Sequence, residues 1–393
     1  MKVLLTLWAI FFALQAQNAS AQSAPYAQEE VVYEEIPAGY VPQEQGGFHY
    51  VGRSQEPVYI QEEIVYANSG AMPMPAHKSA VSSVRAIQQR GKVRCGSNLR
   101  VKSFAHQEDG VWQGVDADFC RIFAIALLGD NNKIEMVDVK PSDAAKALNT
   151  GKIDVMLSGA SYSAAMETSH QALSAGLLYY DHQVLLTTDS IGDRNEDLRG
   201  KKICISTDTD YYKNFEDYNM RYGLDVKYLT FANLEKAKEA FLLKRCDMMT
   251  ASGLMLNGIL LDLPKTKAKI VKTHIALHPI YAFVQKDNNE LRLAIKWILN
   301  ALLLAEQYGI TAKNEAFFAT NDNPEIRNLL GDNPQLWQNL GLRPTWVREA
   351  IKLIGNYADI YDKNIGKDSA YKLERREGRL VKSGGTIYPV PFM

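Results

Sequence analysis

The stretch that decides the fold is Asp154–Leu185, which reads DVMLSGASYSAAMETSHQALSAGLLYYDHQVL. Its pattern predicts a short apolar strand, a turn at Gly159, a short helix and then an apolar-aromatic strand. Short apolar runs bounded by turn residues are typical of strands buried in an α/β sheet. The stretch therefore predicts one strand–helix–strand unit of an α/β fold.

Strand and helix patterns alternate on both sides of this stretch, which indicates parallel α/β sheets. The first unit has predicted strands at Val93–Gly96, Ile134–Val139 and Ile153–Leu157, and helices at Val115–Leu128 and Asp143–Leu148. A second unit has strands at Lys202–Ser206, Val226–Thr230 and Asp247–Thr250, and helices at Tyr211–Tyr222 and Leu234–Leu243. The chain ends in helices predicted at Asn289–Tyr308, Pro324–Leu330 and Pro344–Asp362.

Two further segments, Gln183–Thr188 and Tyr281–Gln285, are predicted as strands that cross between two lobes. Residues 85–393 are enough for two domains of ordinary size. The order of the patterns predicts a first lobe at 85–182, a second lobe at 183–285 and a return to the first lobe at 286–393. Two crossings form a hinge, and two hinged lobes can close over a ligand.

The N-terminus predicts export from the cytoplasm. Lys2 precedes the apolar run Val3–Leu14, which is too short to span a bilayer, and small residues follow near Ala21. We therefore expect residues 1–21 to be a cleavable signal peptide and the mature protein to be periplasmic. The alternative is an uncleaved anchor.

Residues 22–84 form an acidic, Tyr- and Pro-rich segment. Eight Glu against Arg53 and Lys78 give a net charge of −6. Low apolar content with excess charge predicts a disordered arm. It acts either as a tether or as a docking tail, in which the similar blocks Glu29–Tyr33 and Glu62–Tyr66 would add strands to a partner's sheet.

The four cysteines are consistent with an oxidising compartment. They allow three pairings, and we predict Cys95–Cys120 and Cys204–Cys246 because each pair falls within one lobe. The alternative is four buried thiols.

Short motifs then follow one another along the folded region. They are Arg94-Cys95-Gly96, Gly114–Cys120, Gly151–Val155, Tyr179-Tyr180-Asp181, Arg245-Cys246-Asp247, Gly355-Asn356-Tyr357 and Asn364-Ile365-Gly366. In this order, and with the turn after Asp154–Leu157, they resemble the solute-binding proteins of polar and general L-amino-acid ABC transporters. The resemblance implies an α/β, two-lobed periplasmic binding protein (type II) with two crossover hinge strands, preceded here by the disordered arm.

The resemblance also implies an arginine for the ligand's carboxylate and an aspartate for its ammonium group. Here Met166 stands at the arginine position and Ser252 at the aspartate position. In the second lobe, Asp208 and Asp210 flank Thr209 in a turn that usually supplies amide donors to the carboxylate. The candidate cleft residues are Arg100, Phe104, Ser158, Gly159, Ser161, Ser163, Met166, Thr209, Asp210 and Ser252.

A zwitterion enters a closed cleft only if both of its charges are paired. Arg100 and Lys102 are alternative cations for its carboxylate, and Asp208 and Asp210 would instead suit a cationic ligand. Two functions follow. One is a transport receptor with altered or lost amino-acid binding, whose closed form docks on a membrane permease. The other is an envelope binding or structural module that docks partners through its arm and reaches the membrane only through a partner.

Other classes of function find less support. Some dehydratases share this fold and use a cleft carboxylate, for which Glu167, Asp181, Asp210, His170 and His182 are candidates by position. No residue pairing in the sequence would shift their pKa values, so we predict no enzyme. We also predict no cofactor and no metal site. We expect no nucleic-acid binding, because the folded part is only mildly basic and has no clustered run of Lys and Arg.

Overall fold

The computed structural model describes residues 40–42, 48–50, 83–158, 161–169, 172–188, 191–207, 209–263 and 268–392. The predicted signal peptide and most of the arm lie outside this part of the chain. Within the arm, strands β1 (Tyr40–Pro42) and β2 (Phe48–Tyr50) pair antiparallel, with Tyr40 opposite Tyr50.

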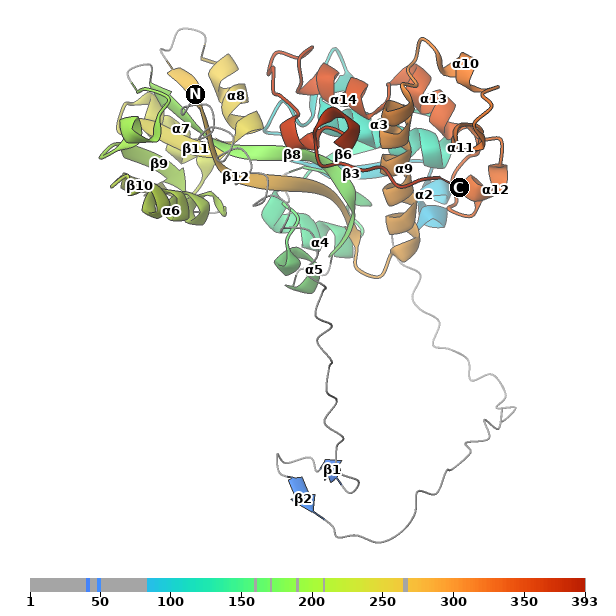
Figure 1. The fold of residues 1–393 in the computed structure, drawn as a ribbon, viewed down its shortest axis with the longest axis horizontal. Coiled ribbons are helices and arrows are strands. Elements are labelled where there is room, and N and C mark those ends of the chain that lie inside the picture. The colour runs from blue at the N-terminus through green and yellow to red at the C-terminus, as the bar shows by residue number, and fades with distance from the viewer. Residues whose placement is uncertain are drawn as a thin grey trace, which may run out of the picture. The chain divides into compact units, whose positions relative to one another are not determined.

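Residues 83–392 form two lobes that share one eight-stranded sheet, in the order β10-β9-β11-β8-β12-β7-β3-β6 (Figure 1). Strand β8 (Ala172–Thr188) and strand β12 (Ala268–Gln285) lie at its centre and run from one lobe into the other. They are much longer than predicted, because they pair antiparallel with each other from Ala172 to Thr188. Register shifts interrupt this ladder, and bulges of this kind bend and twist strands.

The first lobe is built on parallel strands β3 (Val93–Ser97), β6 (Ile134–Asp138) and β7 (Val155–Met156). Buried side chains of β3 pack with helix α3 (Val115–Leu128), and Cys95 is bonded to Cys120 as predicted. The other elements of this part are α2 (Val84–Arg90), β4 (His106–Glu108), β5 (Val111–Gln113), η1 (Pro141–Asp143), α4 (Ala144–Asn149) and α5 (Ala164–Ser169).

The second lobe is built on parallel strands β9 (Lys202–Ser206), β10 (Lys227–Phe231) and β11 (Met248–Ser252). Successive residues of a strand face opposite sides, so Ile203 and Cys204 belong to two different apolar cores. The second predicted disulfide, Cys204–Cys246, is also present. The helices are η2 (Asn195–Leu198), α6 (Tyr211–Tyr222), α7 (Leu234–Leu242) and α8 (Gly253–Leu261).

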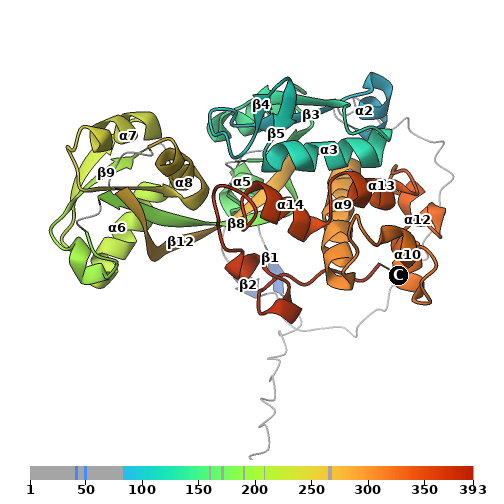
Figure 2. The same ribbon diagram turned by 90° about the horizontal axis from the view of Figure 1, so that it is seen from above.

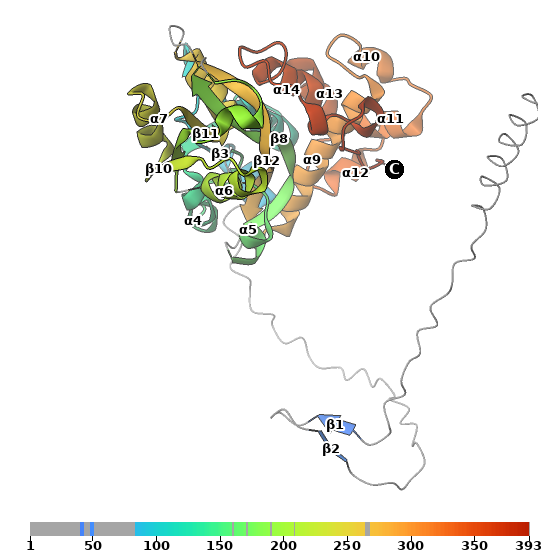
Figure 3. The same ribbon diagram turned by 60° about the vertical axis from the view of Figure 1, so that its left-hand side comes forward.

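After β12 the chain returns to the first lobe as a series of helices, and Figure 2 shows them beside α3. Figure 3 shows the second lobe in front and these helices to one side. They are α9 (Asn289–Tyr308), α10 (Glu315–Phe318), α11 (Pro324–Leu329), α12 (Pro334–Gln338), α13 (Trp346–Leu353), α14 (Tyr357–Asn364), η3 (Arg376–Gly378) and η4 (Val381–Ser383).

The prediction of one helix over Pro344–Asp362 is wrong, because the chain forms α13 and α14 with a break between them. Gly355 has a φ of 116°, which a helix does not allow, and Asn356 then caps α14. The apolar residues that indicated one long helix lie on both short helices and pack into the same core. Among the described residues, no helix combines the length and apolar character needed to cross a membrane.

Candidate ligand-binding cleft

Three of the predicted cleft residues come together around one small cavity between the lobes. Phe104, Ser161 and Ser252 line it, together with Tyr179, Asp181, Tyr211, Met255, His278 and Ile280. The hinge strands supply four of these side chains, and the starts of α6 and α8 supply two from the second lobe. The space in which the centre of a water molecule can lie has a volume of about 20 Å³, so the cavity has room for one water.

The other predicted cleft residues do not line this cavity, or they lie outside the described part of the chain. Ser158 is buried and does not line the cavity, and its hydroxyl accepts from the amide of Asn98 at 3.2 Å. Arg100, Ser163, Thr209 and Asp210 are exposed and do not line the cavity. Gly159 and the side chain of Met166 lie outside the described residues. The alternative cation Lys102 forms an exposed ion pair with Asp262 at 3.7 Å, which joins the two lobes.

Asp181, which the sequence offered only as a candidate enzymatic carboxylate, contacts the second lobe in the cleft. It lies on β8 and is buried, and its carboxylate accepts from the amide of His182 at 2.8 Å and from the hydroxyl of Ser252. The backbone amides of Leu254 and Gly253 also hydrogen-bond to it. Burial raises the pKa of Asp181 to about 6, against the lowering effect of these hydrogen bonds. The motif Tyr179-Tyr180-Asp181 marked this position, but only folding brings it to Ser252.

The position of Asp181 matters because it lies at the N-terminus of α8. The first amides of a helix have no partners within the helix and attract anions. Here the carboxylate of Asp181 accepts from them, and Ser252 caps the same helix by accepting from the amide of Met255 at 3.3 Å. The protein's own carboxylate therefore occupies donors that a ligand's carboxylate would need.

A chain of hydrogen bonds crosses the hinge beside this carboxylate. The ring of His278 contacts the hydroxyl of Ser161 through Nδ1 at 3.0 Å and the amide of Asn214 through Nε2 at 3.4 Å. Asn214 in turn donates to Gln183 at 3.1 Å, and Gln183 donates to Thr250 at 3.1 Å. Burial lowers the pKa of His278, so the neutral ring is favoured and Nε2 can accept from Asn214.

A second buried carboxylate, Asp116, lies at the start of α3. Its Oδ2 accepts from the hydroxyl of Ser97 at 2.7 Å. Burial raises the pKa of Asp116 to about 7, although hydrogen bonds from Ser158 and Ser97 lower it. Both carboxylates raise the pKa of the buried Tyr179, although burial itself is the larger cause. The interior of the hinge is thus a region where negative charge is already costly.

Within the described residues, the cavity lining holds one carboxylate, one neutral histidine, two serines and two tyrosines, and neither lysine nor arginine. Such a lining can accept or donate neutral hydrogen bonds. It offers no cation to a carboxylate. In the part of the chain that the structure describes, no group of three or more His, Cys, Asp or Glu could hold a metal ion.

Two lobes on a shared sheet, joined by two crossing strands with a cavity at the crossing, define the type II periplasmic binding proteins. Residues 93–314 match the family of bacterial extracellular solute-binding proteins, family 3, and the chain belongs to this family. The resemblance inferred from the motifs is thereby confirmed.

Full-length relatives agree with this assignment. The chain is 28% identical over 316 residues to the "Putative amino-acid ABC transporter-binding protein YhdW" of Escherichia coli K12, covering 79% of this chain and 93% of that protein. It is 28% identical over 339 residues to the "General L-amino acid-binding periplasmic protein AapJ" of Rhizobium johnstonii, covering 84% and 99%. These relatives are described as binding proteins and not as enzymes.

One solved structure is similar over most of the chain. It is an ABC transporter periplasmic binding protein from Brucella ovis with glutathione bound, 31% identical, with a TM-score of 0.73. The match covers 78% of this chain and 98% of the other. The fold expected from the sequence is therefore the fold observed.

Proposed function

We propose that this protein is a periplasmic solute receptor of an ABC transport system whose cleft excludes free α-amino acids. The relatives support the receptor role, since two of them are named as amino-acid-binding components of such systems. One observation carries the exclusion: the carboxylate of Asp181 sits at the N-terminus of α8, in a cavity whose described lining has no lysine or arginine. The proposed role is binding without catalysis.

This arrangement makes the binding of a free amino acid unfavourable. Leaving a buried charge without its partner costs about 2–5 kcal/mol, which corresponds to roughly 30- to 5000-fold in affinity. Placing a second carboxylate near Asp181 adds repulsion to that loss. An amino acid that other receptors of the family bind would therefore bind here only at concentrations far above those of a transport cargo.

The same lining favours a solute that has no free carboxylate. The oxygen atoms of Ser161, Ser252 and Tyr211 can accept from an amine or amide, and the rings of Phe104 and Tyr211 can cover an apolar part. Such a solute would enter when the lobes open and be enclosed when they close. The closed form would then dock on the membrane permease.

Matched pairs of ligands test this proposal by thermal shift on the mature protein. Each pair is an amino acid and its decarboxylated amine or amide, for example arginine and agmatine, or glutamine and a carboxyl-blocked glutamine. We expect no shift with any free amino acid at about 1 mM, and a shift of several degrees with at least one amine or amide. A comparable shift with a free amino acid at sub-millimolar concentration would refute the exclusion.

A second candidate function is an envelope module that no longer transports a solute. The observation in its favour is that the lobes already enclose a cavity with room for only one water, with Ser161 joined through His278 to α6. Failure of every amine, amide and amino acid to shift the melting temperature would favour this candidate over the receptor.

A further inference from the structure

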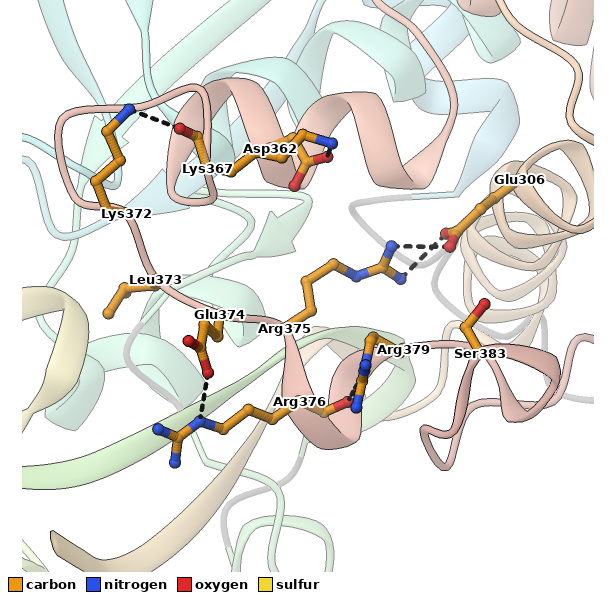
Figure 4. A pocket seen from close by; sticks show the side chains of 10 residues that line it. All are labelled: Glu306, Asp362, Lys367, Lys372, Leu373, Glu374, Arg375, Arg376, Arg379 and Ser383. Atoms are coloured by element: carbon orange, nitrogen blue, oxygen red, sulfur yellow. Dashed lines mark hydrogen bonds and ion pairs between the residues drawn. The ribbon is translucent and has the colours of Figure 1, made fainter. Parts of the chain in front are cut away.

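A cavity larger than the one in the cleft lies in the C-terminal return of the first lobe. Its volume is about 400 Å³, within the range of sites that hold small molecules. It is lined by Glu306, Asp362, Lys367, Lys372, Leu373, Glu374, Arg375, Arg376, Arg379 and Ser383, which Figure 4 shows. Apart from Glu306, these residues follow the segment 93–314 that matches the family.

The charges of this cavity do not balance. Its lining has five cations and three carboxylates, a difference of two positive charges. Each carboxylate has a cationic partner: Glu306 pairs with Arg375, Asp362 with Lys367, and Glu374 with Arg376. The other two cations, Lys372 and Arg379, have no carboxylate within ion-pair distance in the described part of the chain.

Lys372 and Arg379 instead contact the main chain. The ammonium group of Lys372 donates to the carbonyl of Lys367 at 2.6 Å, and Nε of Arg379 donates to the carbonyl of Arg376 at 3.1 Å. Both side chains are exposed at the cavity, and Figure 4 shows them on opposite sides of it. Each keeps further N–H donors available to an anion.

Arg375 holds the walls of the cavity in place. Its guanidinium binds both oxygens of Glu306 on α9, at 2.8 and 3.1 Å, and donates to the carbonyl of Gly378 at 2.9 Å. It also lies over the rings of Tyr357 and Tyr361 of α14, 4.9 and 5.6 Å from their centroids. Because this side chain is only 10% exposed, the loop that carries Lys372 and Arg379 is fixed before any ligand arrives.

We propose that this cavity is a second ligand site, separate from the cleft, that binds an elongated dianion such as a linear dicarboxylate. Two unneutralised cations on opposite sides call for an anionic group at each end of the ligand. A compact anion bound at one of these two cations would leave the other without an anionic partner. The concave site also suits a small molecule better than a flat anionic membrane surface.

Isothermal titration of the mature protein with glutarate and adipate tests the site. Pentanoate serves as the single-charge comparison, and inorganic phosphate as the compact dianion. We expect a dicarboxylate to bind at least about tenfold more tightly than pentanoate or phosphate, since each charged contact contributes about 1.5–3 kcal/mol. Equal binding of dicarboxylate and pentanoate, tighter binding of phosphate, or no binding up to about 10 mM, would each overturn the proposal.

Paired variants locate the effect. Lys372→Gln with Arg379→Gln should weaken dicarboxylate binding by about 100-fold, or about tenfold per cation. The control is Lys313→Gln with Lys352→Gln, which removes two exposed charges elsewhere and should leave the affinity within about twofold. Equal losses in both variants would show general charge attraction and no site. If the first pair fails to fold, Lys372→Gln alone gives the same comparison.

Discussion

Two buried carboxylates, Asp181 in the cleft and Asp116 at the start of α3, make the stability of the hinge interior depend on pH. Asp116 and Asp181 have pKa values of about 7 and 6, raised by burial from a usual value near 3.8. A raised pKa means that the folded protein binds protons that the unfolded chain has already released. The stability from these groups is therefore complete below about pH 4 and is lost as the pH rises through 6 to 7.

Asp116→Asn should remove the larger part of this loss. A shift of one pKa unit corresponds to about 1.36 kcal/mol. From pH 5 to pH 8, the free energy of unfolding of the variant should therefore rise by about 2–3 kcal/mol relative to that of the wild type. Urea unfolding at the two pH values measures this gain.

Asp287→Asn is the control for this variant, because Asp287 is exposed. This variant should change the free energy of unfolding by the same amount at pH 5 and at pH 8. If Asp116→Asn also showed no pH-dependent gain, the carboxylate of Asp116 would not be the buried acid described here.

His278 limits stability on the acid side. Its pKa is lowered by burial, so the folded state favours the neutral ring that accepts from Asn214. This contribution is complete above the usual histidine pKa of about 6.5 and is lost as the pH falls below it. The hinge interior thus holds groups with opposite pH dependence.

At the scale of elements, the break between α13 and α14 shows how a few residues determine the helix ends. Asn356 caps α14 by accepting from the amide of Asp359 at 3.1 Å. Its Nδ2 also donates to the buried carbonyl of Ile310 at 2.9 Å. One side chain therefore starts a helix and ties it to the chain after α9.

Asn356→Ala should destabilise the protein by about 2–4 kcal/mol. A lost cap costs about 1 kcal/mol, and a buried acceptor left without its donor costs about 1–3 kcal/mol. Asn333→Ala is the matched control, because Asn333 precedes α12 but its exposed side chain makes no cap hydrogen bond.

Asn333→Ala should cost less than about 0.5 kcal/mol, and chemical denaturation measures both values. Equal costs in the two variants would contradict the role given to Asn356.

At the scale of the whole molecule, the sequence predicted what depends on local pattern and chain order. Alternating strands and helices predicted the fold, and the division into two lobes predicted which cysteines pair. The sequence offered Asp181 only as a candidate enzymatic carboxylate and not as an acceptor for the first amides of α8. Its contact with Ser252 spans 71 positions, and no local pattern reports it. The break at Gly355 was missed because apolar spacing continued across it.

Helix α2 follows the arm in sequence and is tied to the folded region. Helix α2 begins at Val84, which is buried, and Ser83 caps it by accepting from the amide of Ala86 at 3.2 Å. Ile87 is also buried, and Gln88 donates to the carbonyl of Gly341 at 3.0 Å. Ser83 and α2 are therefore part of the folded region. We expect removal of residues 22–82 to leave the melting temperature within about 1 °C.

Removal of residues 22–90 should instead lower the melting temperature by about 5 °C or more. It takes away α2 with two buried aliphatic side chains, each of which stabilises the fold by about 1.5–3 kcal/mol. Both truncations lack the same arm, so the difference between them isolates the helix. A fall with the shorter truncation would show that the arm itself stabilises the folded region, and equal melting temperatures would show that α2 does not.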